Sequence, residues 1–350
     1  MPVSPVKVTV LTTLYNKAPY VEEAVRSILG NTFTDFEFLV VDDASTDGGL
    51  EKVKVIGDPR IRILESEVNT GRAAAANRGF DTARGEYIAV LDADDIATPD
   101  RLAKQVAFLD GHPEVGAVGS WIQGFGASDA LITMPANDRS ARAQTLFGMP
   151  VIYGAGMFRR SVLEAHGLRC DPHWLHPSMD RLFLLALGRH AQYANLQEVL
   201  IHYRLGEQNM RHGRNAVEDM HYLYRAVFDL FGIPATDKQI ALQTFLHADL
   251  GGPPPSARQV HQLAAWMKEL LAANQRLGIF PMPEFEAQLE KRWKGLFHRI
   301  VLEDAWSALH HMWLTGDLSV RAGYWGKATL QRWLHSRDRV GAGGERATKP

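Results

Sequence analysis

Short apolar runs alternate with amphipathic stretches through roughly the first two hundred residues, and this alternation constrains the fold more than any other feature. Five runs are rich in β-branched residues and end in polar turns, which is typical of buried strands: 6–13, 37–42, 61–65, 87–91 and 115–119. Helical spacing fills the stretches 20–29, 72–83 and 101–111. Strands alternating with helices predict an α/β domain whose largely parallel sheet is covered by helices on both faces.

The pattern changes near residue 206, where the strand signals end. Stretches of helical spacing follow at 215–231, 237–249, 257–277 and 284–313. The final residues are rich in glycine and polar side chains, which favours a frayed terminus. We therefore expect an α/β domain over residues 1–205, an all-helical region over 206–336 and a flexible tail over 337–350.

Charge and cysteine content exclude several classes of function. A net charge of −2 provides no basic field, so we expect no nucleic-acid partner. The single cysteine, Cys170, excludes an intramolecular disulfide and a cysteine-rich metal cluster, and it fits a reducing compartment. No stretch approaches the ~20 apolar residues of a membrane span, and the first apolar run is too short for a signal peptide. We therefore expect a cytoplasmic protein, at most peripheral on the inner face of the cell membrane.

Three polar clusters follow predicted strands at the carboxyl ends, at 15–17, 42–47 and 92–95. Open α/β sheets bind ligands in the crevice outside the carboxyl ends of their strands. The residues alone therefore predict that these clusters form one ligand site at one edge of the sheet.

The motif Asp92-Ala93-Asp94-Asp95 places three carboxylates within four residues, directly after a buried strand. A divalent cation would offset their repulsion, and Mg²⁺ or Mn²⁺ takes carboxylate oxygens together with substrate phosphates. The alternative is an acidic helix start, in which Asp95 or Thr98 caps the helix near Pro99. The position of the motif at a strand end favours the metal.

Two other segments have both a structural and a nucleotide-binding interpretation. Asp42 and Asp43 could cap the polar loop that follows them, or accept hydrogen bonds from a base or sugar edge. Arg72 follows Gly71 in the first turn of a helix, where the helix dipole disfavours a cation and an anion such as a diphosphate would compensate. A solvated surface arginine is the alternative.

Taken together and in order, these motifs resemble glycosyltransferase family 2, whose fold is named GT-A. The matching segments are Thr-Thr-Leu-Tyr-Asn at 12–16, Val-Asp-Asp-Ala-Ser-Thr-Asp at 41–47, Asn-Thr-Gly at 69–71 with Asn-Arg-Gly at 77–79, and 85–95 followed by Pro99. The resemblance covers roughly residues 6–205. No G-x-G-x-x-G follows the first strand, which counts against a dinucleotide oxidoreductase.

The resemblance implies roles for the residues that bind the donor. Thr13 and Tyr15 would hold the nucleobase, with the Tyr15 ring available for stacking. Asp43 would accept a hydrogen bond from the base, with Asp42 as the fallback. Arg72 would lie near the phosphates.

The same resemblance implies the metal site. Asp92 would face the ribose or the water shell of the metal. Asp94 would ligate Mn²⁺ or Mg²⁺, and this ion would bridge the diphosphate and neutralise the leaving group.

The family also places an acid at a helix start in the second half of the domain. Here Asp180 matches it and is the candidate general base, and the segment 154–160 fits the acceptor side. An acid favoured by the helix dipole is the alternative, with Asp171 as the next candidate base. Met179 departs from the acid or glycine that usually precedes this position. The histidine that follows Tyr-Arg in many relatives is also missing after Tyr203-Arg204, and this leaves histidine ligation of the metal open.

The expected activity is metal-dependent, inverting transfer of a hexose or N-acetylhexosamine from a nucleotide-sugar, with UDP as the expected nucleotide. The acceptor would be a hydroxyl of a saccharide or lipid-linked saccharide, as in polysaccharide biosynthesis of the cell envelope. One rival is a nucleotidylyltransferase, which should carry a Gly-rich basic loop where this chain has 15–19. The other is a sugar-nucleotide-binding protein without transferase activity, against which Asp94 and Asp180 argue.

The helical region contains aromatic and basic residues in the segments 293–299 and 325–333. This mixture allows peripheral membrane contact, although ordinary core tryptophan with solvated charges is the favoured alternative. The region could also shape the acceptor site or pair two subunits as a homodimer.

Overall fold

The computed structural model describes residues 6–174, 176–206, 214–247 and 253–315, together with Gly323 and Gly326. The chain divides into two compact units, with the boundary between Arg214 and Asn215. The predicted tail at 337–350 lies outside the described residues, as does the segment 325–333 apart from Gly326.

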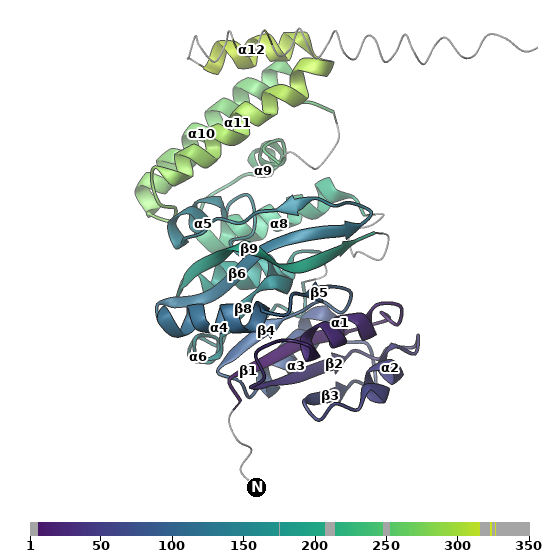
Figure 1. Ribbon diagram of the computed structural model, residues 1–350. Coiled ribbons are helices and arrows are strands. Elements are labelled where there is room, and N and C mark those ends of the chain that lie inside the picture. The colour runs from purple at the N-terminus through teal and green to yellow at the C-terminus, as the bar shows by residue number, and fades with distance from the viewer. Residues whose placement is uncertain are drawn as a thin grey trace, which may run out of the picture. The chain divides into compact units, whose positions relative to one another are not determined.

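The first unit contains one mixed sheet, and within the described residues it has nine strands in the order β3-β2-β1-β4-β8-β6-β9-β5, with β7 paired to β6 (Figure 1). Strands β1 to β4 form parallel pairs, as the sequence predicted. The remaining half is mixed, because β8 is antiparallel to both β4 and β6 while β6 and β9 are parallel. The strands are β1 (Val8–Leu14), β2 (Phe36–Asp42), β3 (Ile61–Glu65), β4 (Tyr87–Val90), β5 (Ile96–Ala97), β6 (Val115–Gly126), β7 (Leu131–Ile132), β8 (Met157–Arg159) and β9 (Gln192–Leu205).

Helices follow most of these strands, as the alternating pattern indicated. The predicted helices at 20–29, 72–83 and 101–111 are present within one residue of their expected ends. The helices of this unit are α1 (Val21–Leu29), α2 (Gly49–Ile56), α3 (Arg72–Thr82), α4 (Arg101–Gly111), α5 (Asp138–Gln144), the short 3₁₀ helix η1 (Tyr153–Ala155), α6 (Arg160–Ala165) and α7 (Met179–Leu187).

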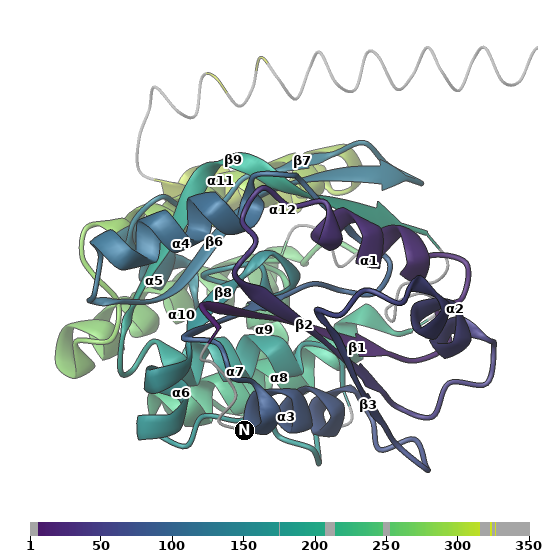
Figure 2. The ribbon, with the colours of Figure 1, turned by 60° about the horizontal axis from the view of Figure 1, so that its bottom comes forward.

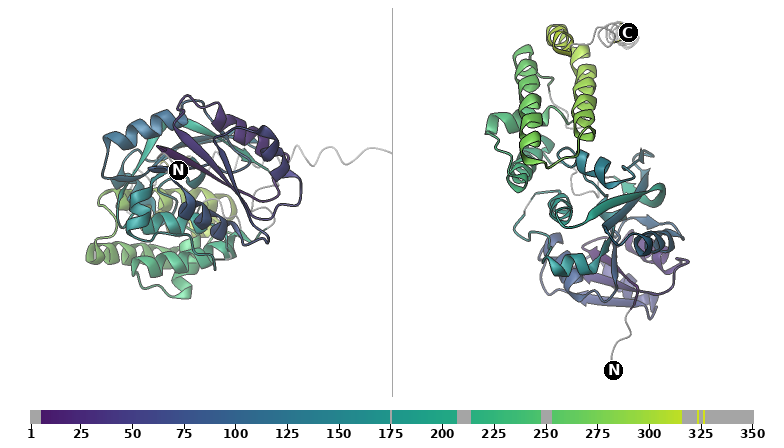
Figure 3. Two further views of the ribbon diagram at one scale, coloured as in Figure 1. Left: turned by 90° about the horizontal axis from the view of Figure 1, so that it is seen from below. Right: turned by 90° about the vertical axis from the view of Figure 1, so that its left-hand side faces the viewer.

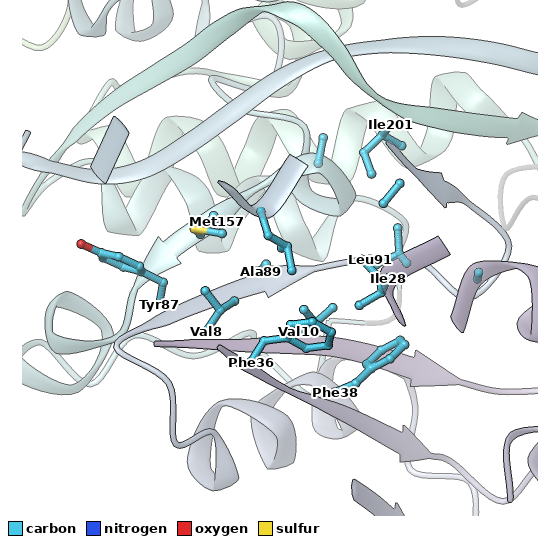
Figure 4. Packing of buried hydrophobic residues seen from close by; sticks show 14 of the residues in the cluster. Val8, Val10, Ile28, Phe36, Phe38, Tyr87, Ala89, Leu91, Met157 and Ile201 are labelled. Carbon is cyan, nitrogen blue, oxygen red and sulfur yellow. The ribbon is translucent and has the colours of Figure 1, made fainter. Parts of the chain in front are cut away.

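The central strands are buried on both faces, which explains why they are continuous apolar runs. Successive side chains of a strand point to opposite faces. Val8 and Val10 therefore pack on one face with Ile28 of α1, whereas Leu11 packs on the other face with α3. Figure 2 shows α1 and α3 on opposite sides of the parallel strands, and Figure 4 shows the first of these two clusters. The expected cover on both faces is confirmed.

Helix α3 approaches β1 closely because of Gly79. A β-carbon at this position would lie 2.3 Å from Cδ1 of Leu11, so only glycine fits without repacking the strand. This close contact packs α3, which begins at Arg72, directly against β1.

The second unit is helical throughout its described residues, as predicted. Its helices are α8 (Ala216–Phe231), α9 (Asp237–Thr244), α10 (Ala257–Leu277), α11 (Glu284–Glu303) and α12 (Ala305–Thr315). A short loop joins α10 to α11, and these two run antiparallel (Figure 3), while α12 contacts both.

The prediction of one helix over 284–313 was wrong. The chain breaks at Asp304, whose backbone is extended at φ −135° and ψ 97°. Its carboxylate accepts hydrogen bonds from the backbone N–H groups of Trp306 (2.9 Å) and Ser307 (3.2 Å), which begin α12. An N-cap aspartate is the physical reason for the break, because it satisfies the first donors of a new helix.

Trp293 and Phe297 belong to the core of this unit, because 8% of Trp293 and none of Phe297 is exposed. The favoured interpretation of segment 293–299 as core tryptophan with charges around it therefore fits these two rings. Among the described residues, no helix is both long enough and apolar enough to cross a membrane.

We predict that His311 makes the stability of this unit depend on pH. The side chain is fully buried, its Nε2 bonds to the carbonyl oxygen of Trp293 at 2.8 Å, and its ring stacks on the Trp293 ring at 4.0 Å. Burial lowers the pKa of His311 from 6.5 to about 4. The unfolded chain therefore binds a proton that the folded chain does not, so stability is complete above pH 6.5 and falls towards pH 4.

The loss over this interval should be about 3 kcal/mol, measured by urea unfolding of the full chain. His311→Gln keeps a donor for the Trp293 carbonyl but does not titrate, so it should remove most of this loss. His173→Gln, at an exposed position, is the control and should keep it. Equal pH dependence in His311→Gln and the wild type would show that His311 is not responsible.

Candidate active site

The carboxyl ends of β1, β2 and β4 bring the three polar clusters to one edge of the sheet. The register pairs Leu14 with Asp42 and Leu11 with Val90. Beyond the strands, the backbone N–H of Asp43 donates to the Leu14 carbonyl at 2.8 Å, and the Thr12 hydroxyl donates to the Leu91 carbonyl at 2.8 Å. The loops 15–18, 43–48 and 91–95 therefore lie at the same edge of the sheet.

Two of these loops are joined by hydrogen bonds. The Asn16 side chain accepts from the backbone N–H of Thr46 at 2.9 Å, and Asp47 accepts from the backbone N–H of Ala18 at 2.7 Å. Thr13 is half-buried near the end of β1, and Tyr15 stands at the rim with 48% of its surface exposed. Of the predicted nucleobase-binding residues, Thr13 therefore lies in β1 and Tyr15 lies on the loop that these hydrogen bonds hold. The Tyr15 ring is accessible for stacking.

Three non-glycine residues in the loops of this region have left-handed backbone conformations. They are Asn16 (φ 51°), Ala44 (φ 62°) and Ser178 (φ 75°). Such a conformation costs about 1–2 kcal/mol per residue, and residues of this kind cluster at functional sites. Each one is next to or within two residues of a side chain that the sequence assigned to the site.

Asp43 organises the loop that leads into α3. Its Oδ1 accepts from the backbone N–H and the hydroxyl of Thr70, and its Oδ2 accepts from the backbone N–H of Gly71, each at 2.8 Å. Only 2% of Asp43 is exposed. A carboxylate has about four acceptor sites, so one remains for a ligand. Asp42 is equally buried and accepts from Ser45 through Oδ2, while its Oδ1 has no partner among the described residues.

Arg72 begins α3 and faces two acids. Its Nη2 lies 3.3 Å from Oδ1 of Asp92, and its guanidinium lies 5.7 Å from the centre of the Tyr153 ring. Burial alone would lower the pKa of Arg72, but the charges of Asp92 and Asp180 outweigh it and the net pKa is raised. Arg72 therefore pairs with Asp92 and is influenced by the charge of Asp180, while 29% of its side chain remains exposed.

Asp94 pairs with a lysine from another loop. Nζ of Lys17 lies 2.6 Å from Oδ2 of Asp94, and the Asp94 side chain is 10% exposed. Arg204, at the end of β9, donates through Nε to the Asp94 carbonyl at 3.0 Å. Arg204 also binds Glu23 of α1 at 2.6 Å, so it connects the backbone of this loop to α1.

Asp95 has a structural role, because it connects this loop to β9. Its Oδ1 accepts from the backbone N–H of Arg204 at 2.9 Å, which ties the loop to β9. Burial, together with the charges of Asp92 and Asp94, raises the pKa of Asp95 to about 9. This shift favours the neutral carboxyl, which reduces the repulsion within the acidic motif.

Asp180 lies in the first turn of α7, after the left-handed Ser178. The segment that precedes it is held to α3 by Asn77, which exchanges two hydrogen bonds of 2.8 Å with the backbone of Cys170. Asp180 is half-buried, whereas Asp171 is exposed and accepts from the backbone N–H of His173. The charge of Asp180 acts on the pKa of Arg72 and on that of Tyr153, which favours Asp180 over Asp171 as the candidate base.

No group of three or more His, Cys, Asp or Glu side chains in the described part of the chain could hold a metal ion. Asp94 and Asp92 are hard oxygen donors on one loop, and they suit a cation that completes its shell with substrate phosphates. The donor set therefore fits Mg²⁺ or Mn²⁺ bound together with a diphosphate, and it does not fit a metal held by protein alone.

The sequence assigned no role to two residues that the fold brings into this region, Lys17 and Arg204. Lys17 stood in the first polar cluster, and a cation opposite an acidic motif was the signal that could have marked it. Arg204 could be placed only through the pairing of β9 with β5 and β6, which joins positions far apart in the chain.

Comparison with known proteins gives a family match. Residues 9–167 match the family described as Glycosyl transferase family 2. The chain is 33% identical over 180 residues to the succinoglycan biosynthesis protein ExoO of Rhizobium meliloti, covering 47% of this chain and 51% of that protein. It is 28% identical over 211 residues to an uncharacterized glycosyltransferase of Haemophilus influenzae, covering 57% of this chain and 65% of that protein. The chain thus spans less than two thirds of these relatives.

Solved structures show the fold. The crystal structure of TarS residues 1–349 from S. aureus, in complex with UDP-GlcNAc, is similar with a TM-score of 0.53 and 19% identity. The likeness covers 91% of this chain and 90% of that one. The GT-A fold predicted from the sequence is confirmed.

We predict that Asp43→Asn destabilises the first unit by about 1–3 kcal/mol, because an amide cannot accept the bonds on both of its sides and leaves a buried donor unsatisfied. Urea unfolding of the full chain would measure this. The control is Asp81→Asn on α3, whose side chain is 60% exposed. A loss in Asp43→Asn no larger than in the control would show that Asp43 does not hold the loop.

Proposed function

We propose that this chain, which belongs to glycosyl transferase family 2 through residues 9–167, is a metal-dependent inverting glycosyltransferase that uses a UDP-sugar donor. The observation that carries the proposal is the meeting of Asp92, Asp94 and Arg72 at the carboxyl edge of the parallel strands, with Asp180 close enough to act on the charge of Arg72. Arg72 can bind a diphosphate, Asp92 and Asp94 can supply oxygen ligands to a metal ion, and Asp180 can accept the proton of an attacking hydroxyl.

The donor nucleotide would bind over the loops that follow β1 and β2. Tyr15 would stack on the base, with Thr13 beneath it. Asp43 would accept from the base through its remaining acceptor site, and the unpartnered Oδ1 of Asp42 is the alternative acceptor. Arg72 would bind the phosphates. UDP is supported by the TarS structures, which were solved with UDP and with UDP-GlcNAc.

Asp94 would hold Mn²⁺ or Mg²⁺, with Asp92 directed at the ribose or at water on the ion. When bound, such an ion neutralises the negative charge that develops on the leaving diphosphate. The protein supplies few ligands, so donor phosphates would complete the coordination shell.

Asp180 would act as the general base. It accepts the proton of the acceptor hydroxyl as that oxygen attacks the anomeric carbon. The bond between the anomeric carbon and the diphosphate oxygen breaks on the opposite face, so the configuration inverts. Arg72 pairs with Asp92 and is influenced by the charge of Asp180, and it could follow the leaving phosphates without a change of protonation.

The transferred sugar is proposed to be a hexose or N-acetylhexosamine, and the acceptor a saccharide or lipid-linked saccharide. The relative ExoO is named for succinoglycan biosynthesis, which supports a role in polysaccharide assembly for the cell envelope. Peripheral contact with the inner face of the membrane, and pairing of subunits, are further proposals for the helical unit.

For the metal ligand, we predict that Asp94→Asn abolishes Mn²⁺-dependent binding of UDP and lowers transfer by at least roughly 10²-fold, because the leaving group loses its charge stabilisation. Calorimetry and a transfer assay would measure the two effects. Asp100→Asn, an acid of the next helix start that pairs with Lys104, is the matched control and should behave like the wild type. Full activity in EDTA, or an active Asp94→Asn protein, would refute the metal site.

For the base, we predict that Asp180→Asn slows transfer by roughly 10²–10⁴-fold while UDP affinity stays within about twofold. The amide keeps the shape and the bond from the backbone N–H of Arg181, and it removes only the basicity. Asp171→Asn serves as the comparison, because Asp171 is the alternative base. Normal turnover in Asp180→Asn together with a slow Asp171→Asn would transfer the role to Asp171.

A further inference from the structure

Lys17 is held in a fixed position at the start of α1. Its carbonyl oxygen accepts from the backbone N–H groups of Tyr20 and Val21, both at 2.9 Å, and the left-handed Asn16 precedes it. The preceding loop is joined to the loop after β2 through Asn16 and Thr46. These contacts hold the backbone of Lys17 in place, so an exchange of partners would involve its side chain alone.

The ammonium of this side chain supplies a positive charge next to Asp94, as a bound metal ion would. It lies 2.6 Å from Oδ2 of Asp94, with 22% of the Lys17 side chain and 10% of the Asp94 side chain exposed. At a mostly buried position a carboxylate needs a cation, and Lys17 provides one. Arg204 binds the Asp94 backbone carbonyl, so it can hold the loop whichever cation the carboxylate has.

We propose that Lys17 is the resident counter-cation of Asp94, and that it exchanges this carboxylate for the donor diphosphate when a divalent ion binds. The proposal rests on the proposed function. A metal ion that binds alone must separate Lys17 from Asp94 and leave two cations close together. When a diphosphate binds as well, the released ammonium gains phosphate oxygens as partners.

This exchange couples the two ligands. Metal binding should be weak without nucleotide and tighter with it, and by thermodynamic linkage the nucleotide gains the same factor from the metal. Lys17 would thereby disfavour the loading of metal without donor. Removing its charge should strengthen metal binding in the absence of nucleotide and reduce the coupling.

The test is the dissociation constant of Mn²⁺, measured by electron paramagnetic resonance or calorimetry on the full chain, with and without UDP. In the wild type, UDP should tighten Mn²⁺ binding by about 5–150-fold, the usual range of coupling. Lys17→Gln should bind Mn²⁺ alone several-fold more tightly than the wild type and lose most of the UDP effect. Lys17→Arg keeps the charge and should keep the coupling.

Lys54→Gln is the matched control, because Lys54 pairs with an acid, Glu65 at 2.9 Å, but on the surface. It removes the same charge and should leave both constants unchanged. Circular dichroism establishes that each variant is folded.

The outcomes separate this inference from the proposed function. If the wild type binds Mn²⁺ and UDP, and Lys17→Gln binds Mn²⁺ alone no more tightly, the counter-cation role is overturned while the glycosyltransferase stands. If the wild type binds neither ligand, both are overturned. If Lys17→Gln and Lys54→Gln gain Mn²⁺ affinity equally, the effect comes from net charge and the inference also falls.

Discussion

Several carboxylates lie close together at the edge of the sheet where β1, β2 and β4 end. Their negative charge must be compensated by other groups of the protein for the fold to be stable. Asp43 is compensated by backbone donors of the next loop, Asp92 by Arg72 and Asp94 by Lys17. Each compensating group comes from another segment of the chain than its carboxylate, so the ion pairs and hydrogen bonds also fix the loops relative to the sheet. The same contacts that stabilise these loops define which charges a ligand must replace.

Much of the fold could be predicted because it is local in the sequence. The parallel strands are continuous apolar runs, and helix α10 has the bounds that its 3.6-residue periodicity and capping residues indicate. The break at Asp304 was missed because an apolar pattern continues through it, although an aspartate three residues before Ser307 is an N-cap signal.

The candidate site could be predicted in outline from three polar clusters, since parallel strands end at one edge. The ion pairs and pKa shifts within the site could not be predicted in this way. That Lys17 pairs with Asp94 depends on the register of β1 against β4, and the pKa of Asp95 depends on burial beneath β9. Both depend on contacts between segments that are far apart in the sequence, so the sequence could mark Lys17 as a nearby cation but could not assign its partner.

The most direct test of the account is the product released from a panel of nucleotide-sugars by the purified chain with Mn²⁺ and saccharide acceptors. The account predicts that one or more UDP-sugars yield free UDP, that the sugar appears on the acceptor with inverted configuration, and that EDTA stops the reaction. Release of pyrophosphate from a nucleoside triphosphate and a sugar phosphate would contradict it. Tight binding of a nucleotide-sugar, with no release of UDP, GDP or ADP across the panel, would contradict it as well.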